Sequence, residues 1–329
     1  ISFYTFQIVA FLVDVWRGEI KEISALDFFL FILFFPQLIA GPIMRHRDFL
    51  PQLDRPVCNR DDLVAGLYLI LLGTIKKVLL ADELGALVGP VWAEPARYDS
   101  LSLALAVFGF IMQVYGDFSG YTDYARGLAR LLGYRIPENF YYPYLASSMS
   151  EIWKRWHVTL STWLRDYLYV PLGGSRVSAS RLYVNIMIVM SLGGLWHGNS
   201  YTFFIWGFLH GLFLVLEKWL QLEEPARTWP AYLIRMPVVF LLFCLAGIFF
   251  RASDLQSAAA IFSGLVDFSS TRQAVAGQSH IAQLGLFTFA LQILQKERGR
   301  IYPFLEKHAL FLIPAFTIIA YFMIVRINR

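Results

Sequence analysis

The sequence predicts an all-α membrane protein, a polytopic bundle of transmembrane helices. Hydrophobic residues make up 57% of the 329-residue chain and charged residues only 16%, against roughly 45–50% and 25% in soluble domains. The apolar residues form continuous runs, whereas the strands of a membrane barrel would alternate over about 10 residues. Two cysteines, Cys58 and Cys244, are too few for a disulfide framework, and no Lys/Arg run indicates nucleic-acid binding.

Long apolar segments mark where the chain is expected to cross the bilayer. A spanning helix needs about 20 mostly apolar residues, and the candidates are 1–16, 26–44, 62–92, 101–133, 182–197, 201–220, 231–250, 281–295 and 309–325. Prolines interrupt the second segment, a lysine pair divides the third into short halves, and two aspartates lie within the fourth: Pro36, Pro42, Lys76, Lys77, Asp117 and Asp123. Such features are tolerated at membrane depth only against protein or a water-filled cavity, so the bundle has an interior.

The chain reads as one integral-membrane domain over 1–329. It starts at Ile1 within apolar sequence, without a methionine or the basic stretch of a signal peptide. We therefore expect an N-terminally incomplete chain, with further spans upstream. The longest polar connection, 134–181, carries more Lys and Arg than acidic residues, which predicts a cytoplasmic location.

The segment 150–167 predicts an amphipathic helix. Apolar side chains recur at spacings of three and four and form one stripe: Trp153, Trp156, Leu160, Trp163 and Tyr167. A polar stripe beside it holds Lys154, His157, Ser161 and Arg165. One interpretation is an interfacial helix with tryptophans at headgroup depth. The other places His157 at a cavity mouth, where Lys154 or Arg155 could hold a phosphorylated donor.

His197 lies inside a long apolar run and is flanked by glycines at 193, 194 and 198. An ionisable residue in a membrane segment is a functional candidate, and a buried neutral imidazole is able to accept a proton. The alternative is a structural histidine bonded to a backbone carbonyl. In one continuous helix, His210 would lie about 20 Å away. A shared two-histidine metal site is therefore not expected unless Gly198–Asn199 breaks the helix.

Two aspartates, Asp117 and Asp123, lie six residues apart. Arg126 is three positions after Asp123, so an intrahelical ion pair accounts for that carboxylate. We expect a structural polar network here rather than paired acid and base catalysts. The sequence contains no P-loop, dinucleotide-binding glycine motif, nucleophile elbow or zinc-protease motif.

Three segments together resemble the membrane-bound O-acyltransferase family in its alginate O-acetyltransferase branch. They are 34–49 (Phe-Phe-Pro-Gln-Leu-Ile-Ala-Gly-Pro onward), 155–174 (Arg-Trp-His-Val-Thr-Leu-Ser-Thr-Trp onward) and 194–198 (Gly-Leu-Trp-His-Gly). Segments 1–18 and 117–123 are also similar to that branch. The resemblance extends in order from residue 1 to about 220.

The resemblance implies a fold with re-entrant and interfacial helices around a central conduit between a cytoplasmic donor site and an extracytoplasmic acceptor site. The family's essential histidine matches His197, and its second recurrent polar residue matches His157. The expected substrate contacts flank these two histidines: Lys154, Arg155, Trp156, Trp196 and Asn199. No bound cofactor or metal is expected, since acetyl-CoA or another acyl thioester is the donor substrate.

The predicted function is transfer of an acetyl group toward hydroxyls of an exported, alginate-like polysaccharide, with neutral His197 as general base. The resemblance implies a periplasmic acetyltransferase partner, polysaccharide export machinery and a bacterial inner membrane. D-alanyl transfer toward teichoic acid is one alternative. A proton-coupled transporter that uses Asp117 and Asp123 is another, although no internal repeat supports it.

Overall fold

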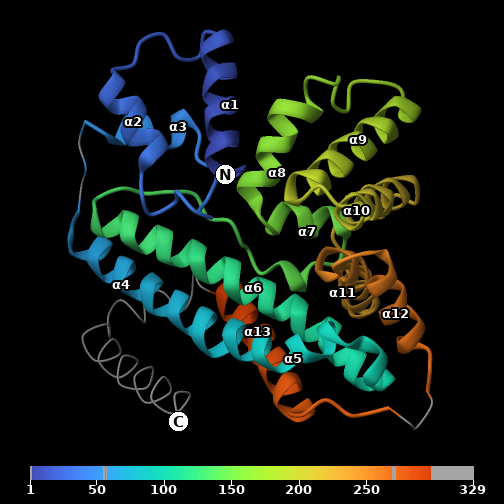
Figure 1. Ribbon diagram of the computed structural model, residues 1–329. Helices are drawn as coiled ribbons and strands as arrows, with labels where there is room; N and C mark the ends of the chain where they lie inside the picture. The colour runs from blue at the N-terminus through green and yellow to red at the C-terminus, as the bar shows by residue number, and fades with distance from the viewer. Residues whose placement is uncertain (1, 55, 57, 269–271, 298–329) are drawn as a thin grey trace.

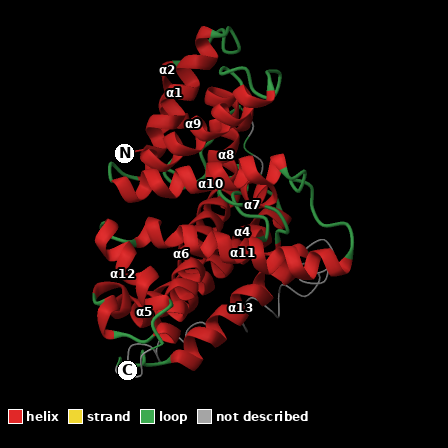
Figure 2. Cartoon of the chain, turned by 90° about the vertical axis from the view of Figure 1, so that its right-hand side faces the viewer, coloured by secondary structure: helices red, strands yellow, loops and turns green. Residues whose placement is uncertain are grey.

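The computed structural model describes residues 2–54, 56, 58–268 and 272–297. These ranges are helical and contain no β-strand, which confirms the all-α prediction (Figure 2). Four helical stretches are long and apolar enough to cross a membrane, namely Arg60–Ala93, Ser100–Leu131, Ala179–His197 and Trp229–Arg251. The predicted span at 309–325 lies outside the described residues.

The helices form three groups in Figure 1. The first holds α1 (Ser2–Trp16), α2 (Ala25–Leu33) and α3 (His46–Phe49). The second holds α4 (Arg60–Thr74), α5 (Glu83–Ala93), α6 (Ser100–Leu131) and α13 (Gln278–Lys296), with α13 against α6. The third contains α7 (Met149–Arg155), α8 (Val158–Leu164), α9 (Ala179–His197) and α10 (Tyr201–Trp219). Two further helices connect the third group to the second, namely α11 (Trp229–Arg251) and α12 (Leu255–Leu265).

Two predicted spans differ from the structure. The prediction of one span over 26–44 was wrong, because α2 ends at Leu33 and the chain then turns through Pro36, which lacks an N–H for helical bonding. The lysine pair also does not split the next segment. The helix is continuous over Arg60–Ala93, and Ile75–Asp82 adopts the wider π-helical form.

The π-helical turn places Lys76 inside the protein. Its ammonium lies 2.6 Å from the Asp123 carboxylate of α6, and the two side chains are 4% and 7% exposed. Arg126 lies 3.7 Å from Asp123 and 3.0 Å from Glu138. The expected structural network is therefore confirmed, but the nearest cation to Asp123 comes from another helix. Asp117 pairs with the half-exposed Lys77.

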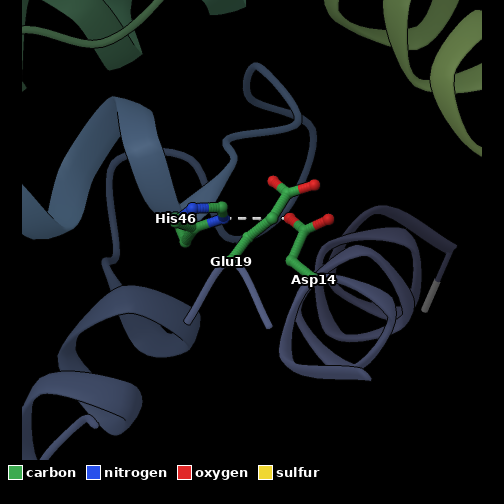
Figure 3. A group of neighbouring side chains, drawn as sticks. All are labelled: Asp14, Glu19 and His46. Atoms are coloured by element: carbon green, nitrogen blue, oxygen red, sulfur yellow. Dashed lines mark hydrogen bonds and ion pairs between the residues drawn. The ribbon is translucent and has the colours of Figure 1, made fainter. Parts of the chain in front are cut away.

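Asp14 joins the first helical group to the π-helical segment Arg165–Tyr169, which follows α8. Its carboxylate accepts hydrogen bonds from the Tyr167 hydroxyl at 2.9 and 2.7 Å, and one oxygen lies 2.9 Å from His46 Nδ1. Figure 3 shows the exposed Glu19 beside this pair, with ligand atoms of all three residues within 4.8 Å of one another. Since Tyr167 and His46 satisfy both Asp14 oxygens, hydrogen bonding accounts for the geometry of this cluster.

Replacing Lys76 by Met is expected to destabilise the protein by about 3–5 kcal/mol, because it leaves the buried Asp123 carboxylate without its closest partner. Thermal unfolding of the purified protein in detergent measures the effect. Adding Asp123→Leu should recover much of the loss. The matched control Lys77→Met should cost no more than about 1 kcal/mol, since its ion pairs are half exposed. Equal unfolding midpoints for Lys76→Met and Lys77→Met would contradict this account.

Candidate active site

The predicted amphipathic helix 150–167 is broken at His157. Helix α7 ends at Arg155, and His157 has a left-handed backbone (φ 45°, ψ 52°) before α8 starts. Asn139 holds the break: its backbone carbonyl accepts from the Val158 N–H at 3.1 Å, and its side-chain oxygen accepts from the Thr159 N–H at 3.1 Å. A left-handed non-glycine residue costs of order 1–3 kcal/mol, so the surrounding contacts must enforce it.

The break turns His157 toward the interior. Its side chain is 1% exposed, and neither ring nitrogen has a hydrogen-bond partner in the described part of the chain. The tryptophans of the predicted stripe are also buried in protein, with Trp153, Trp156 and Trp163 at 9% exposure or less. The tryptophan rings of this stripe therefore pack against protein rather than against lipid.

His197 is the last residue of α9. Gly198 ends the helix, and α10 starts at Tyr201 and packs back against α9. The two helices touch at Gly194, where an added Cβ would lie 2.3 Å from the Phe203 carbonyl oxygen. The Gly198–Asn199 break that the sequence left open therefore occurs.

The hairpin brings His210 back toward His197. The Trp206 indole lies between their rings, at centroid distances of 5.1 Å from His197 and 4.8 Å from His210. His210 is fully buried, and its two ring nitrogens have no hydrogen-bond partner among the described residues. Sequence reasoning set His210 aside because it treated the two segments as one straight helix.

His157 and His197 line the same cavity, which has a volume of about 550 Å³ when the open space at its mouth is included. Its other walls are apolar and aromatic and come from α6, α7, α8, α10 and α11: Phe110, Ile111, Val114, Phe118, Trp153, Trp156, Leu160, Trp206, Phe243, Gly247 and Phe250. None of these lining residues is acidic. An imidazolium here would be an unpaired charge in apolar surroundings, so the neutral imidazole is favoured.

The other sequence-predicted contacts are spread over different environments. Trp156 lines the cavity, and the Trp196 ring lies 6.2 Å from the His157 ring and 4.7 Å from the His197 ring. Lys154 and Asn199 are exposed. Arg155 pairs with Glu151 and lies over the Tyr142 ring.

Sequence reasoning missed most of the cavity wall. Trp153 was treated only as part of a surface stripe, while Trp206, Phe243 and Phe250 carried no signal of their own. These four residues come from α7, α10 and α11 and become neighbours only when those three helices pack. A buried aromatic residue is ordinary in a membrane bundle, so residue type alone could not mark them.

Comparison with known proteins decides the family. Residues 9–253, which include both cavity histidines, match the model described as "MBOAT, membrane-bound O-acyltransferase family". The chain belongs to the membrane-bound O-acyltransferase family. This membership agrees with the resemblance in the sequence and, with the four apolar helices, makes the chain a membrane protein.

The chain is also similar to curated members of this family. It is 38% identical over 297 residues to the "Probable alginate O-acetylase AlgI" of Pseudomonas aeruginosa, covering 89% of this chain and 56% of that protein. It is 34% identical to the "Peptidoglycan O-acetyltransferase" of Helicobacter pylori (81% and 56%). It is 31% identical to the "Teichoic acid D-alanyltransferase" of Streptococcus thermophilus (68% and 58%). The chain thus spans a little over half the length of these relatives.

Gly194→Ala is expected to destabilise the α9–α10 hairpin by about 1–3 kcal/mol, because the new methyl group meets backbone atoms that cannot move aside. Activity should fall with stability, since His197 lies three residues further along the same helix. The neighbouring Gly193→Ala is the matched control, because its Cβ would meet only a Leu164 methyl group at 3.2 Å. Unfolding midpoints in detergent measure both variants, and identical midpoints would rule out the close-packing explanation.

Proposed function

We propose that this protein is an O-acetyltransferase that takes an acetyl group from a cytoplasmic thioester and moves it toward hydroxyls of an exported polysaccharide. The observation that carries the proposal is the placement of His157 and His197 on one apolar, aromatic cavity. Family membership and the names of the relatives support acyl transfer as the reaction class.

The chemistry needs a base next to an activated acyl group. The acceptor oxygen attacks the thioester carbonyl carbon, a C–O bond forms, and the hydroxyl proton passes to neutral His197. The C–S bond then breaks, and the departing thiolate takes that proton, which leaves an ester and a free thiol. General-base assistance of this kind contributes typically about 10²–10⁴-fold.

The environment of the two histidines fits this role. The apolar cavity walls favour the uncharged imidazole, whose nitrogen is able to accept a proton. Apolar walls limit the access of water, which would otherwise hydrolyse the thioester. His157 has two unpartnered ring nitrogens in the described structure, so one of them is free to donate a hydrogen bond to the thioester carbonyl and polarise it.

The donor, the acceptor and the partners belong to the same proposal. Acetyl-CoA or another acyl thioester supplies the acyl group. A periplasmic acetyltransferase receives the acetyl group, and the polysaccharide export machinery is a further partner. The protein itself lies in a bacterial inner membrane. The relatives named for alginate and peptidoglycan acetylation support an acetyl ester on a polysaccharide. Because one relative is named for D-alanyl transfer, an alanyl ester is the alternative product.

A transporter is the weaker interpretation of the same structure. Its proton path would use Asp117 and Asp123, but the two carboxylates form ion pairs with Lys77 and Lys76. Neither aspartate lines the histidine cavity. Ion pairs that join two helical segments therefore account for both carboxylates, with an N–O distance of 2.6 Å in each pair.

His197→Ala is expected to reduce polymer acetylation by at least about 10²-fold, because it removes the general base, while the protein remains folded in the membrane. Mass analysis of the polymer from cells that carry the variant measures the effect and distinguishes acetyl from alanyl esters. His280→Ala is the control, since His280 is exposed on α13. Normal acetyl levels in folded His197→Ala protein would overturn the proposed function.

A further inference from the structure

Four arginines meet where the first helical group joins the π-helical segment Arg165–Tyr169. Each contacts Asp166 or the ring of Tyr167, and we call the four the arginine cluster: Arg17, Arg45, Arg47 and Arg165. Arg17 directly follows α1, and the π-helical segment directly follows α8. The ends of these two helices lie toward the top of Figure 1, so four positive charges converge at one edge of the molecule.

One carboxylate serves three members of the arginine cluster. Asp166 forms all three ion pairs. Burial tends to raise the pKa of Asp166, but hydrogen bonds from Arg165 and Arg45 lower it to about 2, so it is charged at neutral pH. The fourth member, Arg17, forms no ion pair in the described part of the chain. Its guanidinium donates to the Asp166 backbone carbonyl at 3.4 Å and lies 5.3 Å from the centre of the Tyr167 ring. The cluster therefore holds more guanidinium charge than its one paired carboxylate balances.

Buried Arg45 keeps an unused hydrogen-bond donor inside the cluster. Its side chain is 6% exposed, and one of its nitrogens pairs with Asp166. The other terminal nitrogen, Nη2, is buried and has no hydrogen-bond partner within the described ranges. Leaving a buried donor unpaired costs about 1–3 kcal/mol, and more when the group is charged. A ligand with an anionic oxygen at this point would recover that cost.

The nearby acids do not provide this oxygen. Both Asp14 oxygens accept hydrogen bonds from Tyr167, and one of them also lies next to His46. One Asp48 oxygen accepts a backbone N–H at the start of α3. Glu19 is exposed and lies beside Asp14 and His46 (Figure 3). Since none of these three carboxylates forms an ion pair with the arginine cluster where the structure describes the chain, the cluster is open to an added anion.

An apolar stripe on α1 leads to the arginine cluster. Val9, Leu12 and Trp16 recur at spacings of three and four, so they share one face of the helix. All three are exposed, and Trp16 is 83% exposed. Tryptophan is enriched at the headgroup depth of membranes, where basic side chains are attracted to anionic lipids. The stripe and the arginine that follows it therefore match the two parts of a phospholipid, its acyl chains and its phosphate.

We propose that the arginine cluster binds the phosphate of an anionic phospholipid whose acyl chains lie along the exposed stripe of α1. Guanidinium groups bind phosphate oxygens through paired, charge-assisted hydrogen bonds. Arg17 and Arg47 are exposed and receive the phosphate at the surface, while Arg45 supplies the buried donor. The bound lipid contacts both α1 and the π-helical segment, so it stabilises the junction between the first helical group and the end of α8.

The expected side of the membrane agrees with this ligand. The π-helical segment belongs to the basic connection 134–181, which the positive-inside rule assigns to the cytoplasmic face. Anionic headgroups at that face attract each nearby Lys or Arg by about 1 kcal/mol. No member of the arginine cluster lines the cavity of His157 and His197. The lipid is therefore expected to act on stability at this junction rather than on the chemistry of acyl transfer.

Lipid titration of the full chain, purified in a maltoside detergent, tests the site. Native mass spectrometry measures bound phosphatidylglycerol, and phosphatidylcholine with the same acyl chains is the zwitterionic reference. Phosphatidylglycerol should bind more tightly and raise the unfolding midpoint, because a ligand of the folded state stabilises it. Arg17→Gln should weaken phosphatidylglycerol binding about fivefold, equivalent to about 1 kcal/mol. The double variant Arg17→Gln/Arg47→Gln should weaken it about twentyfold.

Arg181→Gln is the matched control, because it removes an exposed arginine at the start of α9 that lies outside the arginine cluster. It should bind phosphatidylglycerol within about twofold of the parent. Size-exclusion profiles establish that each variant is folded. Leu12→Asn keeps the test open if an arginine variant misfolds, since it changes the exposed stripe without changing a charge. It should weaken phosphatidylglycerol binding about threefold or more, because it removes apolar contact with the acyl chains.

Weaker phosphatidylglycerol binding in the arginine variants, with Arg181→Gln unchanged, supports the lipid site. Equal binding of the two lipids by the parent protein overturns it, and so does unchanged binding in the double variant. Glycerol 1-phosphate, which carries the phosphate without acyl chains, is titrated in parallel. If it raises the unfolding midpoint as much as phosphatidylglycerol does at equal concentration, the cluster binds free phosphate and the lipid site is wrong. An acidic carrier protein whose binding needs these arginines, while lipid binding does not, would assign the cluster to a protein partner instead.

Discussion

The geometry of the histidine cavity depends on the hydrogen bonds that buried Asn139 makes to the start of α8. Its side-chain oxygen accepts from the backbone N–H and the hydroxyl of Thr159, at 3.1 and 2.7 Å. The same hydroxyl accepts the Ile43 N–H at 2.9 Å. Three segments distant in the sequence are thus fixed at one point. Without these bonds a regular helix would carry His157 onto a polar surface stripe instead of into the cavity.

The protein separates its charges from the two cavity histidines. Ion pairs join the long helices at Lys76 and Asp123 and the first helical group to the π-helical segment at Arg45 and Asp166. The cavity between them has only aromatic, aliphatic and imidazole groups on its walls. This arrangement allows strong electrostatic attraction to hold the bundle while no fixed charge stabilises a protonated histidine.

Irregular helices recur in this fold, and two of them position the cavity histidines. The π-helical turn at Ile75–Asp82 and the one at Arg165–Tyr169 redirect side chains within otherwise continuous helices. The left-handed backbone of His157 and the end of α9 at Gly198 place the imidazoles of His157 and His197 on the same cavity. Departures from regular helix of this kind often coincide with functional sites, and those at His157 and Gly198 bring both imidazoles to the wall of one cavity.

The sequence by itself determined the class of protein, the order of most helices and the polar network at Asp123, and it singled out His197 and His157 as candidates. These follow from composition, apolar periodicity and short motifs, all of which depend on residues close together in the chain. Tertiary structure decided the break at His157, the Lys76 partner of Asp123, the return of His210 and the shape of the cavity walls. Each of these depends on contacts between distant segments, such as Asn139 with Thr159 or Gly194 with Phe203. Local patterns do not record such contacts, because their free energy is gained only when the helices pack.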